Sequence, residues 1–263
     1  MPHCNTKYIG KVLLEFDELP STNDYLRSFA QQTDTPEGVV VQALRQTAGR
    51  GQMGTVWESA PGQNLTLSIL LKPQNLPADA HTLLSKLAAL AVWDTLQQWA
   101  SQLPVPPGEM HIKWPNDLWI ERRKVCGILI ENTLSGGFIS HSIIGIGLNV
   151  NQQQFSPALA GATSLKQWCL ADVDIEALRC TLLEALERRY DALRCAGEGD
   201  GGLSREYLQY LYGYQTPLTY RTIPEGEVFS GSITGVDQEG RLCIDDGQQL
   251  RRFTLKTVCL HQG

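Results

Sequence analysis

Two short stretches of the sequence carry residue types that can act on an anionic ligand. Residues 49–54 read GRGQMG, so that Arg50 stands between glycines with the G-x-G-x-x-G spacing of dinucleotide-binding loops. Residues 113–117 read KWPND, in which Lys113 comes directly before a Trp-Pro pair. Proline fixes the backbone at a bend, so we expect Lys113 to hold a fixed position. Both stretches could therefore bring a cation to a phosphate or a carboxylate.

The residues that follow the glycines argue against a dinucleotide fold. Such a fold needs a helix directly after the third glycine and an acidic residue about twenty positions later. Here Gly54 is followed by TVWES and by the alternating segment NLTLSILL, which predicts a strand over 64–71, and residue 74 is Gln. We therefore interpret GRGQMG as a flexible loop between two strands.

Three further features each allow a functional and a structural interpretation. Trp57 could stack on a base or could simply fill the core. The segment 143–151, IIGIGLNVN, alternates glycine with aliphatic residues, so either a flat ligand or a packed helix could approach it closely. Asn116 and Asp117 could be ordinary turn residues, and a solvated strand lysine is the plain alternative for Lys113.

The elements that must position these residues predict an α+β fold. Apolar and β-branched runs predict strands, and two segments with helical periodicity predict long helices. The predicted strands are 12–16, 38–44, 64–71 and a close succession from 110 to 151, and the predicted long helices are 79–103 and 174–195. Ser21 or Thr22 is the expected N-cap of another helix. Short turns at 121–123 and 135–137 suggest that the strands between 110 and 151 are antiparallel.

The C-terminal part of the chain differs from the rest in composition and in the length of its predicted elements. The glycine-rich segment GEGDGG at 197–202 marks a change in composition, and a short helix, SREYLQYLY, is predicted after it. Beyond this helix, short strands at close intervals predict a small β-barrel. We place the boundary at Thr216, which gives an N-terminal domain of residues 1–215 and a C-terminal domain of residues 216–263.

Composition excludes several classes of protein. The 263 residues are 42% hydrophobic and 19% charged, with a formal net charge of -6, so general binding to DNA is not expected. The 7 cysteines form no C-x-x-C pair, which predicts neither a disulfide framework nor a clustered zinc site, and most should be buried thiols. No apolar run reaches about 18 residues, which predicts a cytoplasmic protein without a membrane partner.

Taken together, the motifs resemble one family, the biotin protein ligases. The motifs are STN at 21–23, QTAGRG at 46–51, Trp57, KWPNDL at 113–118, KVCGILIE at 124–131 and GIGLNV at 145–150. Their order and spacing cover nearly the whole chain. Because the first motif begins at Ser21, the resemblance is to the short form of the family, without an N-terminal DNA-binding domain.

The resemblance implies a fold and an activity. The implied fold is a catalytic domain like that of class II aminoacyl-tRNA synthetases, with a mixed sheet and flanking helices, followed by a small SH3-like β-barrel. The implied activity is ATP-dependent formation of biotinyl-5'-AMP from biotin and transfer of biotin to a lysine of a biotin carboxyl carrier domain. Mg²⁺ is expected to accompany ATP, with ligands that the sequence does not identify, and a homodimer is possible.

The resemblance also implies roles for individual residues. Lys113 and Arg50 are the implied catalytic cations. The implied biotin contacts are Ser21, Thr22, Asn23, Gln46, Arg50, Gly51, Gln52, Lys113 and Gly127. The implied contacts to ATP or the adenylate are Arg50, Trp57, Lys113, Asn116 and Asn149.

The sequence departs from the family pattern in the glycine loop. Many members have arginines after GRG and again before the tryptophan, whereas this chain has Gln52, Met53 and Thr55. The loop is therefore less cationic, which bears on how tightly it retains an adenylate. Two alternatives stay open: a lipoate or octanoate ligase or transferase on the same fold, and a non-enzymatic regulator or adaptor.

Overall fold

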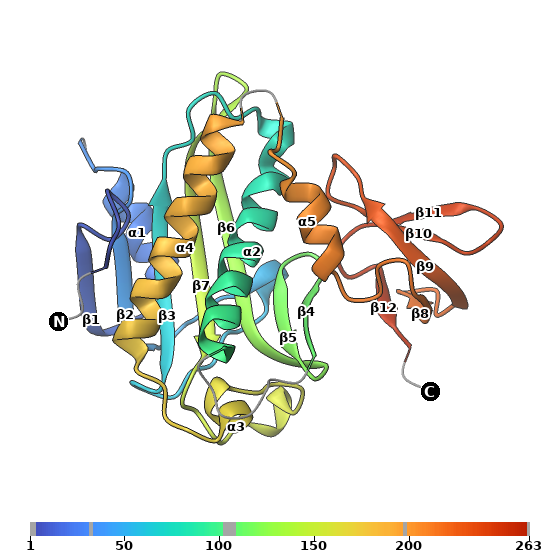
Figure 1. Ribbon diagram of the computed structural model, residues 1–263, viewed down its shortest axis with the longest axis horizontal. Coiled ribbons are helices and arrows are strands. Elements are labelled where there is room, and N and C mark those ends of the chain that lie inside the picture. Colours follow the sequence, from blue (N-terminus) through green and yellow to red (C-terminus); the bar gives the residue numbers. More distant parts are fainter. Residues whose placement is uncertain (1–3, 32–33, 102–108, 197–198, 262–263) are drawn as a thin grey trace.

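A seven-stranded mixed sheet forms the centre of the computed structural model, which describes residues 4–31, 34–101, 109–196 and 199–261 (Figure 1). The strands lie in the order β1 (Leu13–Leu19), β2 (Val40–Gln46), β3 (Asn64–Leu71), β7 (Phe138–Asn149), β6 (Arg123–Ser135), β5 (Asp117–Ile120) and β4 (Met110–Lys113). Strands β1 and β2 are parallel and the other neighbours are antiparallel. The antiparallel pairing expected for the strands between 110 and 151 is confirmed. The parallel pair β1 and β2, whose connection runs through a helix, makes the sheet mixed.

Helices cover both faces of this sheet. The long helices α2 (His81–Ala100) and α4 (Ile175–Cys195) lie side by side across one face, and α5 (Leu203–Tyr210) packs beside α2 (Figure 1). Helix α1 (Thr22–Ala30) packs on the other face, where Leu26 meets Leu70 of β3 in a second, smaller core. Ser21 is the N-cap of α1, as predicted, because its side chain accepts a hydrogen bond from the backbone N–H of Asp24.

The strands divide their residues between the two faces. In β3, Leu65, Leu67 and Ile69 are fully buried in the large core formed with α2 and α4. In β7, Ile144 and Ile146 enter the same core. Because successive side chains of a strand point to opposite faces, the polar and glycine positions between these residues face the side of the sheet on which α1 lies.

A five-stranded antiparallel sheet follows α5. Its strands are β8 (Pro217–Thr222), β9 (Val228–Val236), β10 (Leu242–Asp245), β11 (Leu250–Phe253) and β12 (Val258–Leu260), in the order β11-β10-β9-β8-β12. In the part of the chain that the structure describes, β11 and β12 stand at opposite edges, so this sheet is open. One of its contacts with the rest of the molecule is made by Trp114, whose Nε1 donates to the Gly240 carbonyl oxygen at 3.1 Å.

Several local features correct or complete the predictions. The long predicted helix of 79–103 is α2, and residues 102 and 103 lie outside the described residues. The short helix α3 (Leu165–Cys169) was not predicted, although its Ser164 cap followed by Gln167 is a typical start signal. The turns at 121–123 and 135–137 are confirmed, with left-handed backbone at Glu121 and Gly136.

The cysteine prediction is partly wrong. Cys4 and Cys180 form a disulfide across 176 residues of sequence, with their Cα atoms 4.7 Å apart. Cys126, Cys169 and Cys243 are buried free thiols, as expected. Within the described ranges, no cluster of three or more His, Cys, Asp or Glu side chains is arranged to hold a metal ion.

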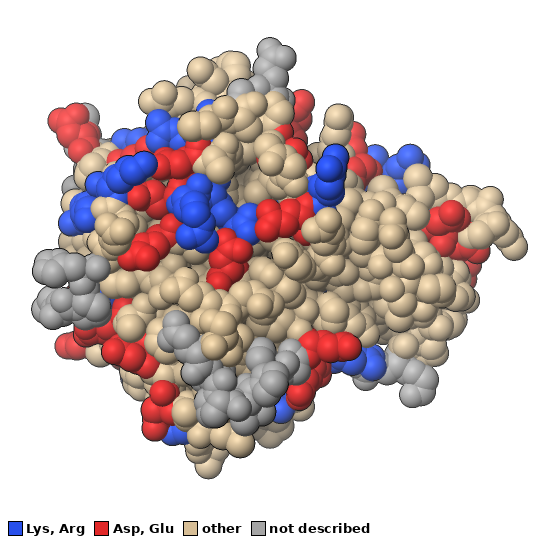
Figure 2. All heavy atoms as spheres, viewed as in Figure 1, with Lys and Arg blue, Asp and Glu red and all other residues tan. Residues whose placement is uncertain are grey.

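Charges of both signs are mixed on the face that carries α2 and α4 (Figure 2). Arg189 of α4 donates hydrogen bonds to Asp94 of α2 at 2.6 Å and to Glu206 of α5 at 2.7 Å, which ties the three helices together. This face offers no broad basic surface to a polyanion. Among the described residues, no helix combines the length and the apolar character needed to cross a bilayer.

The N-terminal segment is fastened to α4 by one carboxylate. Glu187, which is 5% exposed, accepts hydrogen bonds from the backbone N–H groups of Lys7 at 2.6 Å, Tyr8 at 2.9 Å and Ile9 at 2.9 Å. Ile9 itself is fully buried in the large core. The carboxylate thus satisfies one buried N–H donor, that of Ile9, and two partly buried ones.

We predict that Glu187→Ala lowers the free energy of unfolding by about 3 kcal/mol, because it leaves buried and partly buried N–H donors without an acceptor. Urea unfolding with the disulfide intact measures this loss. Glu184→Ala is the matched control, since its bond to the Asn5 N–H is exposed, and it should cost less than about 1 kcal/mol. Equal losses in the two variants would contradict this role of Glu187.

Candidate active site

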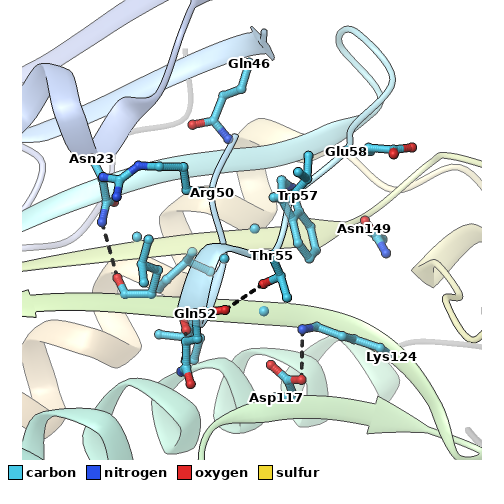
Figure 3. Close-up of a pocket in the computed structure, with 18 of the residues that line it drawn as sticks. Asn23, Gln46, Arg50, Gln52, Thr55, Trp57, Glu58, Asp117, Lys124 and Asn149 are labelled. Atoms are coloured by element: carbon cyan, nitrogen blue, oxygen red, sulfur yellow. Dashed lines mark hydrogen bonds and ion pairs between the residues drawn. The ribbon is translucent and has the colours of Figure 1, made fainter. Parts of the chain in front are cut away.

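A pocket of about 400 Å³ opens on the α1 side of the seven-stranded sheet (Figure 3). A volume of this size is typical of a small-molecule site. The start of α1, the glycine loop, β4, β6, β7 and the loop between β11 and β12 all contribute to its wall. The predicted site residues that line it are Ser21, Thr22, Asn23, Gln46, Arg50, Gly51, Gln52, Trp57, Lys113, Gly127 and Asn149. Residues far apart in the sequence thus meet in one cavity.

A hydrogen-bonded polar group forms one end of the pocket. The backbone N–H of Thr22 donates to Gln46 Oε1 at 2.8 Å, and the Ser68 hydroxyl lies 2.7 Å from Thr22 Oγ1 and 2.6 Å from Asn23 Oδ1. Asn23 Nδ2 donates to Glu131 at 2.8 Å. These side chains are held in place by one another, so they present donors and acceptors in a fixed arrangement.

The glycine loop folds as a tight reverse turn rather than as the start of an α-helix. Gln52–Gly54 form a single 3-10 turn in which Met53 has a left-handed φ of 51°. The Gly51 N–H donates to the Thr55 carbonyl at 2.6 Å, and the Trp57 N–H donates to the Gly49 carbonyl at 2.9 Å. The interpretation of GRGQMG as a loop, and not as a dinucleotide motif, is confirmed.

Trp57 lies on a floor made of glycines. A Cβ atom at Gly147 would overlap the Trp57 indole, and one at Gly127 would lie 3.1 Å from its Cζ3. The buried Nε1 of Trp57 and the buried Oδ1 of Asn149 have no hydrogen-bond partner among the described residues. Asn149 Nδ2, by contrast, donates to the Thr163 carbonyl at 3.0 Å, which fixes the amide. This end of the pocket therefore has an aromatic surface, with one buried donor and one buried acceptor that are unpaired among the described residues.

Lys124 is the site cation that sequence reasoning missed. Its ammonium lies 2.8 Å from Asp117 Oδ2 and 5.9 Å from the centroid of the Trp57 ring, and Figure 3 shows it between Thr55 and Asp117. The signal was present, because Lys124 opens the KVCGILIE motif. In a regular strand Lys124 and Gly127, three residues apart, would face opposite sides of the sheet, but the pairing of β5 with β6 is irregular near Lys124, and both residues line the pocket.

The two predicted cations, Lys113 and Arg50, both contact other side chains of the protein. Lys113 lines the pocket, but its Nζ lies over the Trp119 ring, 4.7 Å from the centroid, and Trp119 is not part of the lining. Arg50 donates to Asp24 Oδ1 at 2.6 Å and to both Glu131 oxygens at 3.3 Å. Arg50 is therefore neutralised by carboxylates at the rim.

Asn116 does not line the pocket. It is 2% exposed and lies behind the glycine loop, where its Oδ1 accepts from Gln52 Nε2 at 2.8 Å and its Nδ2 donates to Ser85 Oγ at 2.9 Å. Its predicted contact with ATP stays a prediction.

The KWPND segment is supported from the helix side. The hydroxyl of Tyr207 in α5 donates to the Pro115 carbonyl at 2.7 Å. Burial raises the pKa of Tyr207, so this donor keeps its proton throughout the ordinary pH range. The segment that carries Lys113 and Asp117 is thus fixed by a hydrogen bond to α5.

Comparison with known proteins decides the family. Residues 15–149 match the model of the Biotin/lipoate A/B protein ligase family. The chain belongs to this family. A bifunctional ligase/repressor BirA of Bacillus subtilis is 34% identical over 251 residues, covering 94% of this chain and 74% of the relative. A biotin–[acetyl-CoA-carboxylase] ligase of Mycobacterium tuberculosis is 33% identical over 229 residues, covering 86% and 80%.

The fold also matches a member of known structure. A biotin protein ligase from Aquifex aeolicus in complex with biotin and ATP superposes with a TM-score of 0.75 at 23% identity, covering 96% of this chain and 100% of that chain. At this identity the likeness concerns the fold. The predicted α+β fold with a mixed sheet is confirmed.

We predict that Gly147→Ala lowers the free energy of unfolding by about 1–3 kcal/mol, because the added methyl group overlaps the Trp57 indole. In a Trp57→Ala background the same change should cost little, and this double-mutant cycle in urea isolates the contact. Gly235→Ala is the control, since a Cβ atom there meets nothing within 4 Å. Additive effects of Gly147→Ala and Trp57→Ala would contradict the described floor.

Proposed function

We propose that this member of the family is an ATP-dependent biotin protein ligase. It activates biotin as biotinyl-5'-AMP and then transfers biotin to a lysine of a biotin carboxyl carrier domain. The observation that carries the proposal is the convergence of the predicted ligand residues on one pocket. The named biotin ligase relatives support the same activity.

Biotin binds at the polar end of the pocket in this proposal. Its ureido ring needs matched donors and acceptors, because an unpaired polar atom in an enclosed site costs binding energy. Thr22, Asn23 and Gln46 supply such groups, and the Ser68 hydroxyl holds the side chains of Thr22 and Asn23. Gly127 leaves room between this end and Trp57.

The nucleotide binds at the Trp57 end. A purine can lie against the indole, and the unpaired Asn149 Oδ1 is an acceptor suited to the exocyclic amine of adenine. The first half-reaction then brings the biotin carboxylate to the α-phosphorus between the two ends. A carboxylate oxygen forms the new bond to phosphorus, and pyrophosphate leaves.

Lys124 supplies the cation at the reacting groups. Its ammonium lies among Trp57, Asp117 and Gly127, between the polar end and the Trp57 end. One unit charge at ~4 Å from a phosphate oxygen contributes roughly 4 kcal/mol at an effective dielectric of 20. Lys113 supports it from β4 as a second cation, and Arg50 adds a planar donor when it leaves its carboxylate partners.

Mg²⁺ enters this scheme as part of the MgATP substrate. Only two carboxylates, Glu58 and Asp117, belong to the described lining, and Asp117 is paired with Lys124. The phosphates are therefore the main Mg²⁺ ligands, as is usual for this ion.

The C-terminal residues complete the site. We assign residues 1–215 to a catalytic domain of the class II aminoacyl-tRNA synthetase type and residues 216–263 to an SH3-like domain. The five antiparallel strands after residue 216 support this assignment, and Leu255 and Lys256 reach the pocket wall. A cytoplasmic location and a homodimer are part of the proposal, and DNA is not a partner in it.

We predict that the full chain, incubated with biotin, MgATP and a carrier domain, adds the mass of one biotinyl group to that carrier. Omission of ATP is the control and should abolish the gain. Lipoate and octanoate in place of biotin test the rival acyl substrates of this family. Modification with lipoate or octanoate but not with biotin would overturn the proposal.

We predict that Lys124→Ala lowers the rate of biotin-dependent pyrophosphate exchange by about a hundredfold, because it removes a preorganised charge from the reacting groups. Lys113→Ala should lower it by less than about tenfold, since its ammonium lies over Trp119. Unfolding curves show whether each variant is folded. A larger loss in Lys113→Ala than in Lys124→Ala would reverse the assignment of the main cation.

A further inference from the structure

We propose that Gln52 is a positioning residue that holds the GRGQMG loop closed through its hydrogen bonds to Asn116 and to the Ile128 carbonyl. The inference rests on the proposed function, since the closed loop would retain biotinyl-adenylate. It concerns a contact made by a neutral glutamine at a position where many biotin protein ligases carry arginine.

Gln52 attaches the middle of the loop to the turn between β4 and β5 and to strand β6. Its Nε2 donates to Asn116 Oδ1 at 2.8 Å and to the Ile128 carbonyl of β6 at 3.1 Å. An amide nitrogen has two hydrogens, so both are used. The neighbouring Met53 side chain is 64% exposed, which shows that the loop turns away from the protein directly after this attachment.

Asn116 accepts from Gln52 because the Ile128 carbonyl fixes the nitrogen end of the Gln52 amide on this side. The Ser85 hydroxyl of α2 can donate or accept, so it holds Asn116 in place without choosing its orientation. Asn116 Nδ2 donates to Ser85 Oγ at 2.9 Å, and the Asn116 side chain is almost fully buried. If the amide were turned around, its nitrogen would face the Gln52 nitrogen, donor against donor. The attachment point of the loop is therefore prepared by a long helix and does not depend on the ligand.

Two other contacts restrain the loop at its surface. Lys256 Nζ donates to the Met53 carbonyl at 3.2 Å, and Arg50 pairs with Asp24 and Glu131. These contacts involve exposed side chains and are weakened by water and salt. The attachment of Gln52 to Asn116 is partly buried and is therefore the one expected to set how often the loop opens.

The donor and acceptor roles allow a matched pair of isosteric variants. Gln52→Glu removes the donor and places a carboxylate against the Asn116 and Ile128 oxygens. Asn116→Asp keeps an acceptor for Gln52 and a second acceptor for the Ser85 hydroxyl. Each change adds one negative charge and leaves the shape of the side chain unchanged, so charge alone cannot explain opposite results.

The first measurement needs no ligand. Hydrogen exchange of residues 49–57, followed by mass spectrometry in the free protein, reports how often the loop opens. We expect exchange to rise about tenfold or more in Gln52→Glu, which loses two hydrogen bonds, and to stay within about twofold of wild type in Asn116→Asp. Met53→Ala is the control within the loop and should leave exchange unchanged.

The second measurement is the release of biotinyl-adenylate, formed with biotin and MgATP and chased without a carrier. Release should accelerate about tenfold or more in Gln52→Glu and remain within about twofold of wild type in Asn116→Asp. Similar behaviour of the two variants in both measurements would overturn the inference. Failure of the wild type to form any adenylate would refute the proposed function, while hydrogen exchange would still decide whether Gln52 holds the loop.

Discussion

The alternation of glycine with large aliphatic residues along β7 is the constraint on which the site depends. Ile144 and Ile146 fill the core beneath α2 and α4, while Gly145 and Gly147 leave the opposite face of the same strand open. The isoleucine side chains of this central strand therefore pack in the core on one face of the sheet. On the other face the glycines have no side chains, so Asn23 and Trp57 can lie directly against the backbone at the floor of the pocket. A side chain at Gly147 would occupy the space that Trp57 takes.

The parts of this arrangement that are local in sequence could be predicted from it. The N-cap at Ser21, the loop nature of GRGQMG and the long helices follow from neighbouring residues, and the structure agrees with each. Convergence of the site residues was implied by the family resemblance, and most of them do line one pocket. Periodicity and turn chemistry act over a few residues, which is why these predictions succeed.

Features that depend on distant partners could not be predicted. The buried position of Asn116 is set by Ser85, which is 31 residues away in α2, and the Cys4–Cys180 disulfide spans 176 residues. Pocket access of Lys124 depends on an irregular strand pairing that no local pattern reveals. Parallel pairing of β1 with β2 likewise follows from the path of the chain through α1, rather than from the composition of either strand.

The central claim is that one continuous pocket holds biotin at the Thr22 and Gln46 end and the nucleotide at the Trp57 end, with Lys124 between them. A crystal structure of the chain with a non-hydrolysable analogue of biotinyl-5'-AMP tests this most directly. The account predicts the ureido ring against Thr22 and Gln46, the adenine against Trp57 and Asn149, and the Lys124 ammonium within hydrogen-bond distance of the acyl-phosphate linkage. A ligand bound in the reverse direction, or a linkage that Lys124 does not contact, would contradict it.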